Sequence, residues 1–104
     1  MLIVTGSITA RSDTFDALLR AALDHVHRSR AEDGCLAHGI YADCEDPLKL
    51  FFYEEWADRP ALDAHFEQKG SQAFMAAVRE LAARSTPLRI MPIEERRFPY
   101  DRRR

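Results

Sequence analysis

The sequence contains no long apolar run, and none approaches the ~20 residues that a membrane-spanning helix needs. Its first ten residues, MLIVTGSITA, also lack the basic segment and the longer apolar core of a secretory signal. These two absences predict a cytoplasmic protein with no membrane partner.

An excess of charge of one sign is lacking too. The chain has 15 lysines and arginines against 17 aspartates and glutamates, a net charge of -2. Dedicated nucleic-acid binders are normally strongly basic, so we expect no nucleic-acid partner. Five arginines do gather between Arg96 and Arg104. We interpret residues 99–104 as a basic, solvated tail that follows one domain over residues 1–98.

Cysteine is scarce, and its two positions predict neither a disulfide nor a zinc site. Cys35 and Cys44 flank a predicted strand, which would hold them roughly 30 Å apart when extended. A disulfide needs Cα atoms within about 7 Å. The sequence has no C-x-x-C pair, and His25 and His27 point apart on a helix. We therefore predict no metal site.

What the chain does contain is an alternation of short strands and amphipathic helices. The expected strands cover residues 2–10, 36–43 and 48–56, with an extended segment over 88–98. The expected helices are one from a cap at Ser12 or Asp13 to about residue 31, one opened by Asp58 and Pro60, and one that Lys69-Gly70-Ser71 begins and Ser85-Thr86-Pro87 ends. This order predicts an α+β, ferredoxin-like split βαβ fold with an antiparallel sheet and helices on one face. The other face is too apolar for solvent, so we expect a homodimer.

The strand over residues 48–56 carries an unusual carboxylate. Alternation places Glu54 between Phe52 and Trp56 on one face, and Phe51 and Tyr53 on the other. A carboxylate in such apolar surroundings has to find a partner, keep some water or stay protonated. Glu54 is therefore a candidate functional residue.

The helix after this strand brings a histidine towards the same place. His65 shares a helix face with Leu62 and Phe66, and that face is expected to pack on the sheet. His25 lies at one border of the apolar stripe of the first helix and can face the cleft, whereas His27, near the opposite border, is expected in solvent. A purely structural alternative stays open, in which His65 and Trp56 are packing residues.

The residues that carry this pattern resemble a known family. The helix end Glu32-Asp33-Gly34-Cys35, the run Phe52-Tyr53-Glu54-Glu55-Trp56 and the later His65 are similar to the antibiotic biosynthesis monooxygenase family, within the dimeric α/β-barrel superfamily. The resemblance extends over residues 1 to about 97. It implies a homodimer in which two sheets form a barrel, with a ligand cleft between sheet and helices in each subunit.

Several members of that family oxidise phenols or hydroquinones with O₂ and use no flavin, haem or metal. The resemblance therefore implies no cofactor and a small aromatic substrate, with His65 and Glu54 as catalytic residues. The expected substrate-binding residues are Trp56, Tyr53, Phe66 and His25. Haem-degrading relatives use an asparagine on the first strand, which residues 2–10 lack, so haem cleavage is not expected. The alternative function is a non-catalytic metabolite-binding or isomerase-type protein of the same fold.

Overall fold

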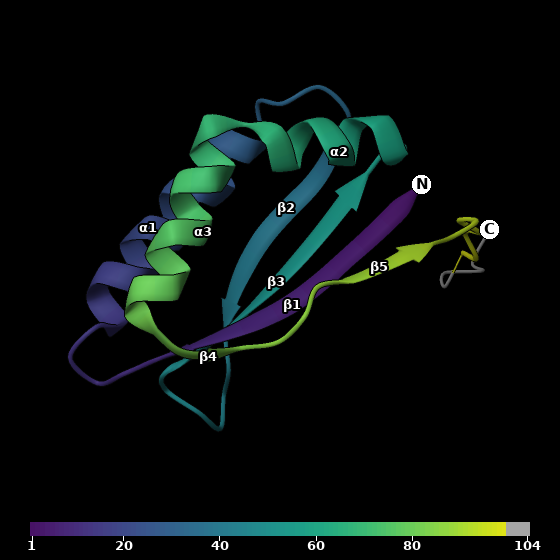
Figure 1. Cartoon of the computed structure of the whole chain (residues 1–104). Helices are drawn as coiled ribbons and strands as arrows, with labels where there is room; N and C mark the ends of the chain where they lie inside the picture. Colours follow the sequence, from purple (N-terminus) through teal and green to yellow (C-terminus); the bar gives the residue numbers. More distant parts are fainter. Residues whose placement is uncertain (100–104) are drawn as a thin grey trace.

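The computed structural model describes residues 1–99 as a single sheet with three helices (Figure 1). In chain order the elements are β1 (Leu2–Ala10), α1 (Phe15–Ser29), β2 (Cys35–Ala42), β3 (Lys49–Trp56), α2 (Arg59–Glu67), α3 (Lys69–Leu81), β4 (Ala82–Ser85) and β5 (Arg89–Pro92). The predicted α+β class is confirmed.

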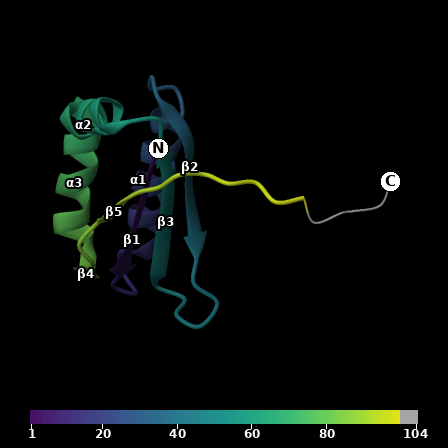
Figure 2. The ribbon, with the colours of Figure 1, turned by 90° about the vertical axis from the view of Figure 1, so that its right-hand side faces the viewer.

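The sheet is antiparallel, with the strand order β2-β3-β1-β4. β5 also pairs with β1, so β4 and β5 share one edge of that strand. All three helices lie on one side of the sheet, and the other side carries no helix of the described chain (Figure 2). This is the predicted ferredoxin-like arrangement.

The turn between β2 and β3 sets the register of the site. Asp46 accepts a hydrogen bond on Oδ1 from the backbone N–H of Leu48, and Asp43 accepts one on Oδ1 from that of Glu45. Such aspartate side chains stabilise a tight turn. The resulting register pairs His38 with Glu54 across the two strands.

The core lies between the sheet and the helices, in two clusters of buried apolar side chains. The larger cluster joins α1 to the sheet, and its members are Ile8, Ala10, Leu18, Ala22, Val26, Leu50 and Phe52. The smaller cluster, Val4, Trp56 and Leu62, fixes α2 over the end of β3. Asp58 caps α2 as predicted, since its Oδ1 accepts from the N–H of Ala61. These contacts position His65.

Several predicted boundaries are wrong. α1 begins after Thr14, whose Oγ1 donates to the carbonyl oxygen of Leu81, and neither Ser12 nor Asp13 is its cap residue. The helix ends at Ser29 rather than near residue 31. A single residue, Gln68, separates α2 from α3, because its backbone is extended with a ψ of 141°.

The end of the described chain also differs from the predicted pattern. α3 ends at Leu81, because residues 82–85 leave the helix and pair with the end of β1. The extended segment expected over residues 88–98 is a strand only over Arg89–Pro92. Proline has no N–H to donate, which is in keeping with an edge strand that ends there.

The remaining expectations concern the cysteines, membrane-spanning helices and the C-terminal tail. Cys35 and Cys44 are free thiols. Within residues 1–99, no helix has the length and apolar character needed to cross a membrane. The predicted tail falls mostly on residues 100–104, which lie outside the described residues.

Candidate functional site

A cavity of about 510 Å³ opens between the sheet and α3. Its walls are mainly apolar and include Ile8, Phe52, Phe66, Phe74, Met75, Val78, Leu88 and Ile90. α3 buries only Ser71 fully among its residues. Phe74 and Val78 of its apolar stripe pack against the core cluster of the sheet and also line the cavity. Gly6 helps to shape the wall, because a Cβ there would lie 2.7 Å from Leu88 Cδ2. A volume of this size suits a small organic molecule.

Three polar side chains lie together on the wall of this cavity. His25 from α1, Glu54 from β3 and His65 from α2 all line it, and each is at most 5% exposed. The predicted convergence of His65 and Glu54 is therefore present in the structure, and His25 joins them. Phe66, the predicted ring contact, also lines the cavity.

His65 is held in one orientation by a carboxylate on the far side of its ring. Its Nδ1 lies 2.9 Å from Glu32 Oε1, and the Glu32 side chain is itself only 14% exposed. A carboxylate only accepts hydrogen bonds, so Nδ1 carries the proton and Nε2 keeps a free lone pair. The Trp56 ring packs against the imidazole at a centroid distance of 4.5 Å. In the neutral form of His65, Nε2 is thus the nitrogen that can accept a proton.

Glu54 is buried but well partnered. Its Oε1 accepts a hydrogen bond of 2.9 Å from Trp56 Nε1 and lies 3.3 Å from His38 Nε2. Burial by itself would raise the pKa of the carboxyl group, but the neighbouring His38, Trp56 and His65 together lower it below 4.5. Glu54 is therefore ionised at neutral pH and places a negative charge beside the cavity.

His25 is a neutral imidazole. Its ring stacks on Phe74 with centroids 4.4 Å apart, and its Nδ1 lies 2.7 Å from Arg28 Nη2. Burial is the main cause that lowers the pKa of His25 to about 3, with His38, His65 and Arg28 adding to it. Because the guanidinium only donates, Nδ1 accepts and the ring proton is on Nε2.

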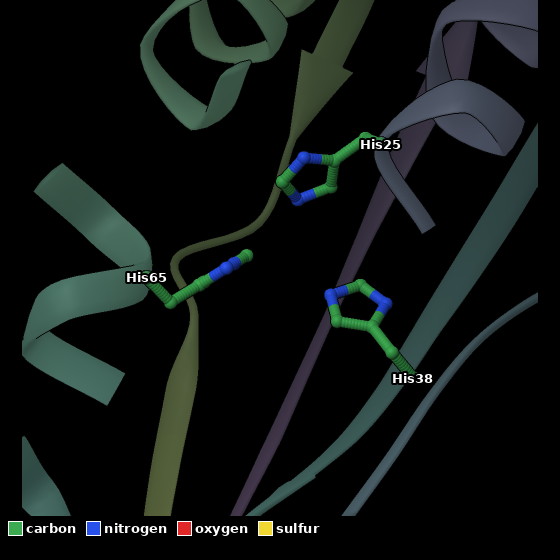
Figure 3. Close-up of side chains that lie close together, drawn as sticks. All are labelled: His25, His38 and His65. Carbon is green, nitrogen blue, oxygen red and sulfur yellow. The ribbon is translucent and has the colours of Figure 1, made fainter. Parts of the chain in front are cut away.

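Two residues of this site were missed by sequence reasoning. His38 from β2 is 4% exposed and lies beside His25 and His65 (Figure 3). Glu32 is the partner of His65. Strand alternation and the register of the 43–48 turn could have placed His38 opposite Glu54. Glu32 belongs to the helix end Glu32-Asp33-Gly34-Cys35 that carries the family resemblance, but no local pattern connected it with His65. His27 is exposed, as predicted.

Two predicted substrate contacts lie elsewhere. Tyr53 points to the helix-free face of the sheet, where its hydroxyl donates to Glu55 Oε2 at 2.6 Å. Trp56 is fully buried behind His65 and is not part of the cavity wall. Tyr53 points away from the cavity because side chains alternate along a strand, and Tyr53 is the direct neighbour of Glu54 on β3. Trp56 does not reach the cavity wall because its indole packs in the small cluster with Val4 and Leu62.

Comparisons with known proteins bear on the family and the fold. The family model described as antibiotic biosynthesis monooxygenase matches residues 1–77. A Mycobacterium tuberculosis protein named "Putative monooxygenase Rv0793" is 34% identical over 94 residues, covering 88% of this chain and 91% of that protein. An uncharacterised Synechocystis protein is 28% identical over 90% of this chain, which spans only 64% of that longer relative. A Deinococcus radiodurans crystal structure superposes with a TM-score of 0.90 at 20% identity, over 97% of this chain and 100% of that one.

Proposed function

Since the chain belongs to the antibiotic biosynthesis monooxygenase family, we propose that it oxidises a small phenol or hydroquinone with O₂ and without an organic cofactor. The observation that carries this proposal is the largely apolar cavity with an oriented imidazole on its wall. The cavity can hold one aromatic ring by burial, and the polar group can act on its hydroxyl. Both features are needed for a reaction whose reducing power comes from the substrate itself.

In the proposed mechanism His65 is the general base. Its Nε2 has the free lone pair, since Glu32 holds the proton at Nδ1. Removal of the phenolic proton gives an electron-rich anion, which can pass an electron to O₂. For a phenol, one oxygen atom then forms the second carbonyl of a quinone and the other leaves in water. The Glu32 carboxylate stabilises the imidazolium formed in the first step.

Glu54 and His25 have supporting roles in this proposal. Glu54 is ionised and lies on the same wall, so it favours a protonated His65 over a neutral one after proton transfer. His25 is neutral, with its Nε2 proton available to donate to a second substrate oxygen. The phenyl rings of Phe52, Phe66 and Phe74 are candidates for holding the aromatic ring.

We also propose that the protein works as a homodimer through the helix-free face of the sheet. Tyr41 and Phe51 pair across β2 and β3 on that face and are 57% and 41% exposed. Their register with Gly39 and Tyr53 makes a continuous aromatic strip on β2 and β3. A second copy covering this strip would remove apolar surface from water.

One variant tests the proposed base. We expect His65→Ala to lower kcat/KM by roughly a hundredfold or more for a hydroquinone that the wild type oxidises, the usual share of general-base catalysis. Oxygen uptake, corrected for autoxidation, measures turnover, and the melting temperature is measured in parallel. His27→Gln is the matched control, because this exposed imidazole lies on α1 outside the cavity.

The two readouts separate catalysis from packing. A packing histidine would lower the melting temperature and leave the turnover of each folded molecule unchanged, which removes His65 from the mechanism. If the wild type never exceeds autoxidation across a panel of phenols and hydroquinones, the non-catalytic metabolite-binding alternative is favoured.

A further inference from the structure

Three histidines from three different elements meet beside the cavity. His25, His38 and His65 are all buried, and their ligand nitrogens lie within 4.8 Å of one another. Their ring centroids are 5.1, 5.3 and 5.6 Å apart, and Figure 3 shows the three rings around one common space. Burying several side chains that can become positively charged so close together is costly unless other groups compensate for it.

We propose that these three imidazoles bind one divalent transition-metal ion. With metal–nitrogen bonds of 2.0–2.1 Å, a tetrahedral three-histidine site places its ring centres about 5 Å apart. The observed centroid spacing already meets this value. The nitrogens have to approach to roughly 3.4 Å, which rotation of the rings in place can provide. The backbone therefore holds the rings at the distance that such a site requires.

His38 supplies the independent observation that a ligand is expected here. Neither of its ring nitrogens has a hydrogen-bond partner within residues 1–99, although the ring is completely buried. Its Nε2 comes within 3.3 Å of Glu54 Oε1, but in a geometry that makes no hydrogen bond. Buried polar atoms are nearly always satisfied, so a buried imidazole whose only polar contact is this carboxylate, and which lies beside two other imidazoles, has unused capacity to bind an ion.

The surroundings of the rings suit a cation. Glu32 holds His65 by Nδ1, the carboxylate–histidine contact that orients metal-bound imidazoles and leaves Nε2 for the ion. With Glu54, it provides two carboxylates next to the site, which balance a charge of 2+. His25, His65 and Glu54 line the cavity, so an ion can enter from there and a fourth coordination position faces it. Imidazole donors favour zinc, cobalt, nickel or copper over magnesium or calcium.

Arg28 opposes the ion and gives the proposal a distinctive test. Its Nη2 donates to His25 Nδ1, which holds the proton of that ring on Nε2 and adds a positive charge. Gly70 makes this possible, because a Cβ there would lie 2.0 Å from Arg28 Nε. Binding through His25 Nε2 moves the ring proton to Nδ1 and displaces Arg28. Arg28→Gln should therefore bind the ion more tightly, since Gln can accept from Nδ1–H and is uncharged.

The proposal goes beyond the proposed oxidation. An ion on His65 Nε2 occupies the lone pair that the general base uses, so the metal-bound and base forms exclude each other. For that reason the test measures binding in chelator-treated protein and does not depend on any activity. Loss of metal binding and loss of oxidation can then be told apart.

The test is titration of the full chain with Co²⁺ and Zn²⁺. We expect one ion per chain, a visible Co²⁺ absorption typical of four-coordinate nitrogen sites, and shifted ring signals for His25, His38 and His65 by NMR. His38→Gln should weaken binding by roughly a hundredfold, Arg28→Gln should tighten it several-fold, and His27→Gln should leave it unchanged.

Two results would overturn the proposal. One is Zn²⁺ that shifts only His27, the remaining histidine of the four in the chain, which would mean surface binding. The other is unchanged affinity in folded His38→Gln. Should that variant fail to fold, the wild-type NMR titration decides by itself, because it reports each ring separately.

Discussion

Strand β3 carries two donor–carboxylate pairs that occupy opposite faces of the sheet. On the helix-covered face, Trp56 Nε1 donates to Glu54, two residues away; on the helix-free face, Tyr53 donates to Glu55, also two residues away. The first pair is buried, with Trp56 at 0% and Glu54 at 4% exposure. The second pair is part-exposed.

The difference shows how one strand serves two purposes. Glu54 is buried beside the Trp56 indole and the His38 imidazole, so its negative charge acts on the groups around the cavity. Glu55 keeps contact with solvent, and its pair with Tyr53 belongs to the surface that we propose for the second copy. Because side chains alternate along β3, the carboxylate beside the cavity and the pair in the proposed dimer surface lie on opposite faces of the sheet.

The largest expected effect comes from a charge placed on the helix-free face. Phe51→Glu places a charge at the centre of the aromatic strip, and burying it in the proposed dimer would be costly. We expect dimer affinity to fall by at least roughly a hundredfold, measured by sedimentation or light scattering at micromolar concentration.

Leu23→Glu is the matched control for this variant. Leu23 is also exposed, at 37%, but it lies on α1, away from the helix-free face. It should leave the dimer intact. A wild-type protein that is monomeric at micromolar concentration would contradict the proposed assembly outright.

The second prediction compares the two pairs by removing one donor from each. Trp56→Phe leaves a buried carboxylate short of a hydrogen bond and opens a cavity, so we expect a loss of about 2–4 kcal/mol in the free energy of unfolding. Tyr53→Phe should cost less than about 1 kcal/mol, because solvent reaches that pair.

Urea titration of both variants in the Phe51→Glu background measures this difference without a contribution from the dimer interface. Equal losses would mean that the two faces do not differ in the way their burial indicates. The variants also report on chemistry, since Tyr53→Phe should leave any oxidation rate unchanged.

Local patterns accounted for the fold and half of the site. The alternation in residues 48–56 predicted the faces of Glu54 and Tyr53, and Asp58 with Pro60 predicted the start of α2. These features depend on residues close in sequence. The boundaries of α1 and α3 were predicted less well, because contacts such as Thr14 to Leu81 join residues 67 apart.

The histidine cluster is the clearest case of what sequence reasoning could not reach. His25, His38 and His65 are 13 and 27 residues apart along the chain, so no spacing rule for metal ligands applies to them. Their convergence follows from tertiary packing that brings α1, β2 and α2 together, and Glu32, in the connection after α1, joins them by its contact with His65. The prediction of no metal site rested on residues close in sequence, and it stays a prediction that the titration with Co²⁺ and Zn²⁺ tests.

The smallest expected effect concerns the acidity of the Tyr53 hydroxyl in the pair on the helix-free face. The hydrogen bond to Glu55 is the main cause that raises the pKa of Tyr53 above 10, because the phenol donates to a carboxylate that cannot donate back. In Glu55→Gln the acceptor loses its charge, so the Tyr53 hydroxyl should ionise at a lower pH. NMR or ultraviolet titration of wild type and variant checks this, with Tyr53→Phe used to identify the signal.

The sign of the stability effect follows from the same shift. Because the folded-state pKa of Tyr53 is raised, its pair stabilises the fold fully below pH 10 and loses that contribution as the pH rises further. Wild type and Glu55→Gln should therefore differ by a constant amount near neutrality and converge in strongly alkaline solution. Convergence near neutral pH instead would indicate that Glu55 acts through another group. Glu54, with its lowered pKa, should show the opposite trend: its contribution is present above pH 4.5 and is lost as the pH falls.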